Sequence, residues 1–457
     1  MKNKAIYFAT LLLTQNIFSA ESLSTKIHNQ YQSLRAMGMG NAFTTVADDY
    51  SALMYNPAVL AKKKRGEIQF TMVGAGVSSA TTTIMKDITD ADKNAVGDTA
   101  KATAISNVLD QYYGKPLGAR VQALEIFWVR PNWGFAILPL DLTLDMTVQR
   151  QLGPALDLSI KKDSTLAYGY GKDISSSLSA GLLAKVIHRD SVEQSVSALD
   201  LATNSNILSQ DRFNEGINAD LEIGFLWTPP FLKSTVVEKK PVLEKPVTEK
   251  KSETTPAEEI KKSDDTNRNP QSESVVAKDS TTDPAINSAT STDTTAAEKI
   301  ISAAPVEEMK TVVITPLSVS FVARNLISSS YSKSTLVNKL ATTVPANNPR
   351  VIDIGVGYDL ANWGDLTLRT TLEAKNLLHP NTTVKKSSHA GFEIDYSPGT
   401  WFKTQIRAGI NQMYFTGGVT LLLGVIEIDA VTYGEEVGTS STNVENRVSA
   451  LKIGLNF

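Results

Sequence analysis

The sequence predicts an all-β protein, a 14-stranded antiparallel transmembrane β-barrel with an N-terminal lumenal hatch. Three observations predict this fold. The chain starts with the layout of an export signal. It then shows repeated segments, about 9–11 residues long, in which apolar and polar residues alternate, as in a tilted membrane-spanning strand. No apolar run of about 18 residues follows the signal, which excludes helical membrane spans.

Composition excludes several classes of function. The formal net charge of the 457 residues is −3, so the basic surplus typical of nucleic-acid binding is absent, and no nucleic-acid partner is expected. The chain has no Cys, which excludes disulfides, Cys metal sites and thiol catalysis. Its four His residues are scattered without metal-ligand spacing, and no nucleotide-binding or hydrolase motif is present. We therefore expect no enzyme activity, no catalytic residues, no metal and no cofactor.

Residues 1–20 are expected to be a secretory signal peptide. Lys2 and Lys4 precede an apolar run over Ala5–Leu13, and small residues follow at Ser19 and Ala20. A membrane anchor is the alternative, but the apolar run is too short to span a bilayer. Phe18 occupies a position where a small residue is preferred, so the cleavage point stays open.

Residues 21–65 are expected to form a plug rather than a strand. The stretch Leu34–Ala61 is rich in Gly and Ala and has no clean period of 2 or 3.6. Gly38 and Gly40 permit backbone dihedrals that other residues resist, and Pro57 prevents a regular ladder. The alternative is a short amphipathic helix over residues 47–53, with a proline stop, in a soluble domain.

Fourteen alternating segments follow, an even number that favours barrel closure. Residues 66–228 hold strands one to six, and residues 317–457 hold strands seven to fourteen. The expected strands are Glu67–Val77, Val121–Arg130, Trp133–Met146, Ser164–Lys172, Leu178–His188, Ile217–Thr228, Leu317–Ile327, Val351–Leu360, Asp365–Leu377, Ala390–Tyr396, Trp401–Ile410, Gly417–Leu423, Ile426–Tyr433 and Arg447–Phe457.

The links between these strands fall into two kinds. Short links such as Pro131–Asn132 are expected at the periplasmic end, and the long links Ser78–Arg120 and Arg189–Gly216 outside the cell. One link expected at the periplasmic end, residues 229–316, is long instead of short, because it contains a low-complexity insertion. Within it, Lys233–Val306 is expected to be disordered, since it buries too little apolar surface to offset ordering entropy. It is either inert or a tether to a periplasmic partner or the cell wall.

The N-terminal stretch also resembles a known family. The pattern Arg-Ala-Met-Gly-x-Gly, then Ala-Asp-Asp, then Tyr-Asn-Pro-Ala resembles the N-terminal segment of FadL/TodX-type outer-membrane transporters of hydrophobic compounds. It is closer still to their PorV-like relatives. A second match, INQMYFTGGVTLLLG followed by IEIDAVTYGEEVG, lies near the C-terminus.

This resemblance implies a location and a mechanism. The chain would be a multi-pass protein of the outer membrane of a Gram-negative bacterium, in contact with outer-membrane lipid. Its N-terminal segment would fold into the lumen as a hatch, and small hydrophobic, fatty-acid-like molecules would pass by passive uptake. The hatch motif carried over onto this sequence is Gly38, Gly40, Asp48, Asp49, Asn56, Pro57 and Ala58.

Three further groups of residues are candidates for function. In FadL-type barrels a kink in the third strand opens the wall laterally, and Pro139 lies in the expected third strand; the alternative is a harmless bulge. Three arginines on the lumen face are expected to hold the hatch by pairing with Asp48 and Asp49: Arg324, Arg369 and Arg407. Apolar residues of the hatch are candidate ligand contacts, or merely pack the plug: Met37, Met39, Phe43, Leu53 and Met54.

Two partner interactions remain open. The terminal Phe457, after alternating apolar residues, resembles the signature that the barrel assembly machinery recognises. A PorV-like role is the alternative to uptake, in which the barrel docks a secretion or surface-assembly partner through the two long outer links. A conjugation-associated role, as in other relatives, is a third.

Overall fold

The structure is a computed structural model that describes residues 25–149, 155–203, 208–231, 234–240, 308–314, 316–327, 330–341, 343–399, 401–439 and 441–457. The expected signal peptide, residues 1–20, lies outside the described residues. So do residues 241–307, which make up most of the stretch expected to be disordered.

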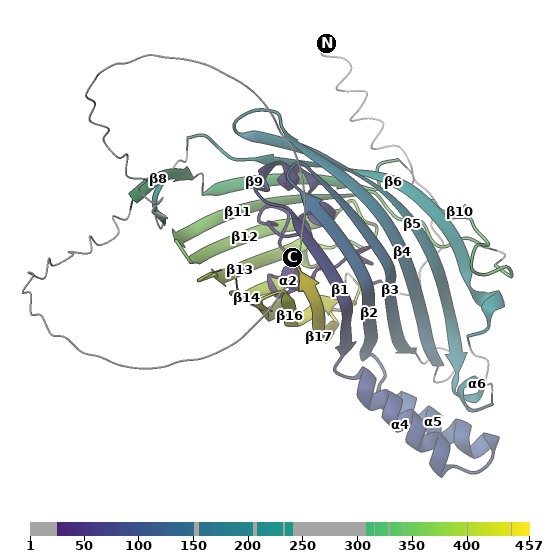
Figure 1. Ribbon diagram of the computed structural model, residues 1–457. Helices are drawn as coiled ribbons and strands as arrows, with labels where there is room; N and C mark the ends of the chain where they lie inside the picture. The colour runs from purple at the N-terminus through teal and green to yellow at the C-terminus, as the bar shows by residue number, and fades with distance from the viewer. Residues whose placement is uncertain are drawn as a thin grey trace, which may run out of the picture. The chain divides into compact units, whose positions relative to one another are not determined.

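Fourteen antiparallel strands form a closed barrel (Figure 1). Each strand pairs with its neighbour in sequence, β1 pairs with β17 to join the two ends of the chain, and β6 pairs with β9 across the insertion. The barrel strands are β1 (Glu67–Ser78), β2 (Pro116–Arg130), β3 (Trp133–Gln149), β4 (Ala155–Asp173), β5 (Leu178–Ser197), β6 (Asn214–Trp227), β9 (Leu317–Arg324), β11 (Val351–Trp363), β12 (Leu366–Leu377), β13 (Ser388–Tyr396), β14 (Phe402–Asn411), β15 (Tyr414–Leu423), β16 (Ile426–Glu436) and β17 (Glu445–Asn456).

The predicted fold class is confirmed, and all fourteen expected strands form. Alternation places apolar side chains on the outer face and buries polar ones inside, as a lipid-facing barrel requires. Closure also pairs the strand backbones internally, which the hydrocarbon core demands. None of the helices in the described part of the chain combines the length and hydrophobicity of a membrane-spanning helix.

The strands differ from expectation mainly at the end with long links. β4 and β5 contain 19 and 20 residues, so β5 runs well past its expected end at His188. The expected long link Ser78–Arg120 holds two helices, α4 (Thr81–Asn94) and α5 (Asp98–Gln111), and α6 (Ala198–Thr203) follows β5. Ile84, Ile105 and Leu109 of the helices pack with apolar residues of the extended strands. This buried cluster makes regular structure beyond the membrane stable.

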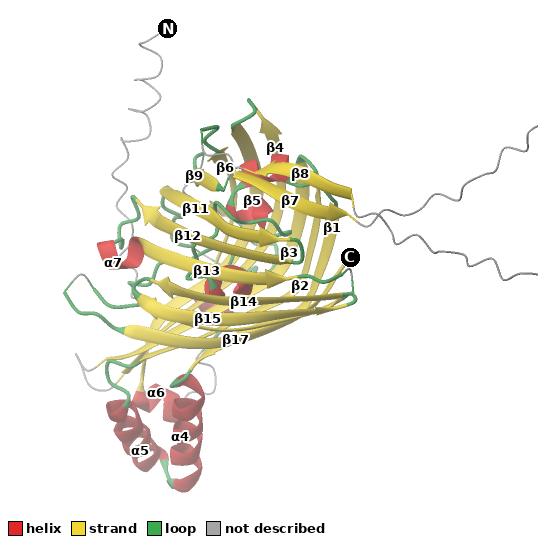
Figure 2. Cartoon of the chain, turned by 90° about the vertical axis from the view of Figure 1, so that its left-hand side faces the viewer, coloured by secondary structure: helices red, strands yellow, loops and turns green. Residues whose placement is uncertain are grey.

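The insertion also contains regular structure at its edges. β7 (Ser234–Lys240) and β8 (Glu308–Ile314) form a two-stranded sheet (Figure 2). Strand β7 lies inside the Lys233–Val306 stretch, so the expected disorder was wrong for these seven residues. Their Ser-Thr-Val-Val run suits a strand, and pairing with β8 satisfies its backbone.

Candidate functional site

The N-terminal residues Thr25–Lys62, here called the lumenal segment, pass through the barrel from one end to the other. They contain two short helices, α2 (Leu34–Gly38) and α3 (Ala52–Tyr55), and a 3₁₀ helix, η1 (Pro57–Lys62). Nearly all of residues 31–60 are buried. The alternative of a single amphipathic helix in a soluble domain is therefore wrong.

The first residues of the segment are held at the end with long links. Thr25 donates its hydroxyl to the carbonyl of Gly438 at 3.0 Å, and Lys26 pairs with Asp145 and Glu435, each at 2.9 Å. His28 lies 3.3 Å from Asp163, but burial lowers the pKa of His28 to about 3. That contact is consequently a hydrogen bond between neutral imidazole and carboxylate.

Glycines allow the segment to pass very close to the wall. Gly40 has φ +66°, and a Cβ there would lie 2.2 Å from the carbonyl oxygen of Ala390. On the wall, a Cβ at Gly224 would lie 2.1 Å from Oδ1 of Asn56. These positions need glycine for space, and Gly40 needs it for backbone conformation as well.

Asn56 and Pro57 form a turn that fixes the last part of the segment. The Asn56 amide donates to the carbonyls of Thr44 at 3.0 Å and Phe225 at 3.3 Å, and its Oδ1 accepts from the Ala58 N–H. Pro57 begins the 3₁₀ helix, where its missing N–H costs nothing. The sequence motif Asn-Pro-Ala thus acts through backbone capping inside the lumen.

Arg35 is the centre of a buried ion-pair network. Its guanidinium reaches Asp48 at 2.6 Å and Asp49 at 3.0 Å within the segment. It also binds Glu393 of the wall in a bidentate pair, at 2.6 and 2.8 Å. The Arg35 side chain is only 5% exposed and that of Glu393 is fully buried, so the pair is shielded from water.

The three arginines expected to pin the segment have different partners. Arg369 pairs with Asp48 at 2.6 Å. Arg407 instead pairs with Glu393 and Asp429 of the wall. Arg324 reaches neither Asp48 nor Asp49: it binds Glu222 and Asp353 and donates to the carbonyls of Met54 and Tyr55 at 2.9 and 2.6 Å.

Two of these arginines therefore contact the segment directly. Burial raises the pKa of Asp48, but Arg35 and Arg369 outweigh burial and hold it well below its usual value. Sequence reasoning missed several further contacts. Arg35 lies within the recognised motif, so its role could have been predicted from the sequence. The wall contributes three more contacts that no sequence pattern indicated: Lys375 binds Asn41, His389 binds Gly40 and Lys452 binds Tyr50.

The five candidate ligand contacts are buried in three separate clusters. Met39 and Phe43 pack with Tyr55, whereas Leu53 and Met54 pack with wall residues of β2 to β5. Met37 packs with Val431 and Tyr433. The structure therefore brings only pairs of them together.

Pro139 lies at an interruption of the wall. The pairing of β3 with β4 shifts register between Leu138 and Asp141, and the Pro139 carbonyl accepts from the Ser164 hydroxyl at 2.7 Å. A side chain thereby replaces a lost ladder bond. Neighbouring strands are irregular at the same level, because β2 has Leu124 at φ +58° and β1 shifts register beside Val73.

A cavity opens at the end of the barrel with short turns. It encloses about 710 Å³ and is lined by charged residues of both signs, including Arg35, Asp48, Lys63 and Asp429. A second cavity of about 80 Å³ lies beside Tyr31 and Arg324. Most of the residues that line these two cavities are polar or charged.

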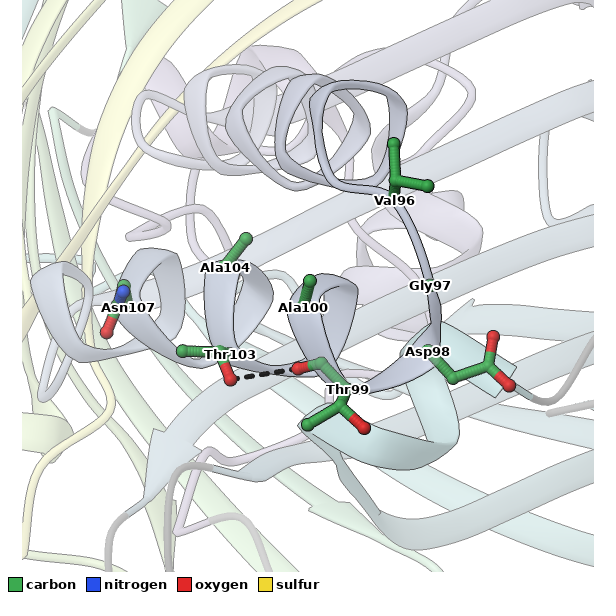
Figure 3. Close-up of a pocket in the computed structure, with 8 residues that line it drawn as sticks. All are labelled: Val96, Gly97, Asp98, Thr99, Ala100, Thr103, Ala104 and Asn107. Atoms are coloured by element: carbon green, nitrogen blue, oxygen red, sulfur yellow. Dashed lines mark hydrogen bonds between the residues drawn. The ribbon is translucent and has the colours of Figure 1, made fainter.

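A third cavity lies outside the barrel, at the turn between α4 and α5 (Figure 3). Small side chains such as Ala100 and Ala104 line it, and Asp98 is its single charged residue. It lacks the convergent polar groups of a binding site.

One cluster of potential metal ligands exists among the described residues, formed by His188, Asp190 and Glu215. Glu215, however, already accepts from the backbone N–H groups of Leu336, at 2.7 Å, and Asn338, at 2.6 Å, and from His188 at 2.8 Å. Its oxygens hold the loop after β10 (Ser332–Lys333), so this cluster is better explained as a structural anchor.

Comparisons with known proteins identify similar barrels only among solved structures. No protein family profile and no curated protein matches the sequence. The CymD monoaromatic hydrocarbon channel matches with a TM-score of 0.39 and 8% identity, over 92% of this chain and 96% of CymD. The Ralstonia pickettii toluene transporter TbuX matches with a TM-score of 0.39 and 8% identity, over 96% of this chain and 100% of TbuX.

The Pseudomonas putida toluene transporter TodX matches with a TM-score of 0.38 and 8% identity, over 97% of this chain and 99% of TodX. These channels are of the type that the N-terminal motif resembles.

Proposed function

We propose that this protein is an outer-membrane channel for passive uptake of small hydrophobic molecules, with the lumenal segment as its hatch. The observation that carries the proposal is an apolar cluster between the segment and the irregular part of the wall. Leu53 and Met54 of the segment pack there with Phe127, Ala136 and Leu138. Movement of the segment would free an apolar space directly beside the bulge at Pro139.

The contacts that hold the segment suit a hatch. The segment is attached to the wall by ion pairs and hydrogen bonds, centred on Arg35 and Arg324. When Arg35 leaves, Glu393 keeps Arg407 and Arg369 as neighbours, and Asp48 can no longer reach the wall. The wall charges thus remain compensated in an open state, which lowers the cost of opening.

The bulge at Pro139 provides the lateral exit in this proposal. Three adjacent strands are irregular at one level, so the ladder is weakest there. A hydrophobic molecule leaving sideways would avoid the charged cavity at the end with short turns. A fatty-acid-like substrate fits this route, because its chain would move from the apolar cluster into lipid.

Replacement of Pro139 tests the route. We expect Pro139→Val to restore ladder pairing and slow uptake of a hydrophobic dye such as N-phenylnaphthylamine into cells, without lowering the yield of folded barrel. Pro398→Val, in the exposed turn before β14, is the matched control and should leave uptake unchanged. Equal uptake by both variants and the parent protein would exclude the lateral exit.

Docking of a protein partner is the second candidate function. The helices α4, α5 and α6 with the extended strands form a firm platform at the end with long links (Figure 1). Co-purification of a cell-surface protein, lost on deletion of residues 81–111, would favour docking. Elongated apolar density inside the barrel would favour uptake.

Recognition of Phe457 by the barrel assembly machinery remains a prediction. The Phe457 side chain is exposed, and its backbone pairs with that of Ile68.

A further inference from the structure

Exposed aromatic residues gather at the end of the barrel with short turns. All five Trp of the chain lie there: Trp128 and Trp133 flank one turn, Trp227 ends β6, and Trp363 and Trp401 flank two more turns. Four of them are more than 40% exposed. Such a belt marks the level of the lipid headgroups.

Strands β1 to β4 add cations to this belt. Arg130 lies two residues beyond Trp128, and Lys172 lies two residues beyond Tyr170, so each cation shares the outer face with its aromatic neighbour. Lys64 and Arg65 stand exposed just before β1, at the rim of the charged cavity. All four cations therefore lie on the water side of the aromatic belt.

Cross-strand pairing brings Arg130 and its aromatic neighbours into one patch, and Gly66, next to Arg65, lies against the Arg130 side chain. Ile68 pairs with Trp128, Arg130 with Trp133, and Trp133 with Tyr170. The Arg130 guanidinium lies 5.7 Å from the Trp128 ring centre, and the Trp128 and Trp133 rings meet edge to face at 5.2 Å.

The cations of the patch have no acidic partner in the described part of the chain. Within the described residues, Lys64, Arg65, Arg130 and Lys172 form no ion pair, whereas the nearby acids Asp173 and Glu67 are already paired with Lys62 and Lys63. The opposite wall differs, because Lys403, beside the exposed Trp401, pairs with Asp395 at 3.0 Å. Among the described residues, the unpaired cations of this end lie on the side of the barrel formed by β1 to β4.

We propose that this patch binds the phosphodiester headgroup of an anionic phospholipid, such as phosphatidylglycerol. Its acyl chains would lie along Ile68, Phe135 and Tyr168, one row closer to the membrane centre. Arg65 and Arg130 would hold the phosphate, since guanidinium suits bidentate binding of phosphate oxygens. The site rests on the transmembrane barrel alone and does not depend on what passes through the lumen.

Native mass spectrometry of the full-length barrel in detergent tests the site. We expect phosphatidylglycerol to bind more tightly than zwitterionic phosphatidylethanolamine of the same acyl chains. The double variant R65Q/R130Q should weaken phosphatidylglycerol binding about 10- to 25-fold, since each interfacial cation contributes about fivefold. R65K/R130K keeps the charge and should retain most of the preference.

The matched control is K333Q/K339Q, which removes two exposed cations from the end with long links. It should leave lipid binding unchanged. Equal affinity for the two lipids, or equal loss in R65Q/R130Q and in the control, would overturn the proposal. The four side chains changed in these variants, Arg65, Arg130, Lys333 and Lys339, are all exposed. Heat-modifiable gel migration should therefore show each variant as a folded barrel.

Discussion

Removal of the Arg35 guanidinium should open the hatch. Arg35→Gln takes one partner from a buried carboxylate, for which the cost is about 3–5 kcal/mol. Glu393 retains Arg407 and Arg369, and Asp48 retains Arg369, so we expect the lower end, about 3 kcal/mol. The Asp48 side chain is 47% exposed, and its share of that loss is small. The open population should therefore rise about 100-fold.

Conductance of the purified barrel in planar lipid bilayers measures this change. The parent protein should be nearly closed, and R35Q should show frequent openings at the same protein density. The control variant is Arg447→Gln, which breaks a pair with Glu445 whose side chains are about one-third exposed. A folded R35Q barrel with parental conductance would refute the hatch and its electrostatic attachment.

Two further predictions concern the same segment. Gly40→Ala should lower the thermal unfolding midpoint, measured by circular dichroism, far more than Gly97→Ala: both have positive φ and share a strain of about 1 kcal/mol, but only at Gly40 would a Cβ meet the wall. The contribution of the Asp48 ion pairs to closure should stay constant from pH 8 to about 4, because Arg35 and Arg369 hold the pKa of Asp48 below its unfolded value of 3.8. This contribution is complete above 3.8 and is lost only as pH falls through the lower folded value, so the conductance difference between the parent protein and Asp48→Asn should be the same at pH 8 and pH 6. A difference that disappears by pH 6 would contradict the ion-pair account.

The sequence predicted the barrel because lipid imposes strict alternation on every strand. The outer ends of β4 and β5 were missed because that constraint stops beyond the membrane. There Leu156 and Leu158 are buried by helices, and no sequence period predicts such contacts. The short turns and the motif in the lumenal segment could also be predicted from the sequence, because both depend on local backbone chemistry.

Side-chain partners in the lumen were harder to predict. Any of several wall arginines could face Asp48, and the register and tilt of distant strands decide which one does. Arg369 does reach Asp48, whereas Arg324 binds backbone carbonyls and Arg407 stays on the wall. Arg35 was overlooked because the partners of Asp48 and Asp49 were expected among the wall arginines, although Arg35 lies only 13 and 14 residues before them.

The passage of the lumenal segment through the barrel sets the order in which this protein can be built. Arg35 is made early, but its partner Glu393 lies 358 residues later, and Lys452, which binds Tyr50, is in the final strand. Contacts so distant in sequence form late and slow the search for the native state. The segment therefore cannot be fully attached until β17, the last strand, is in place.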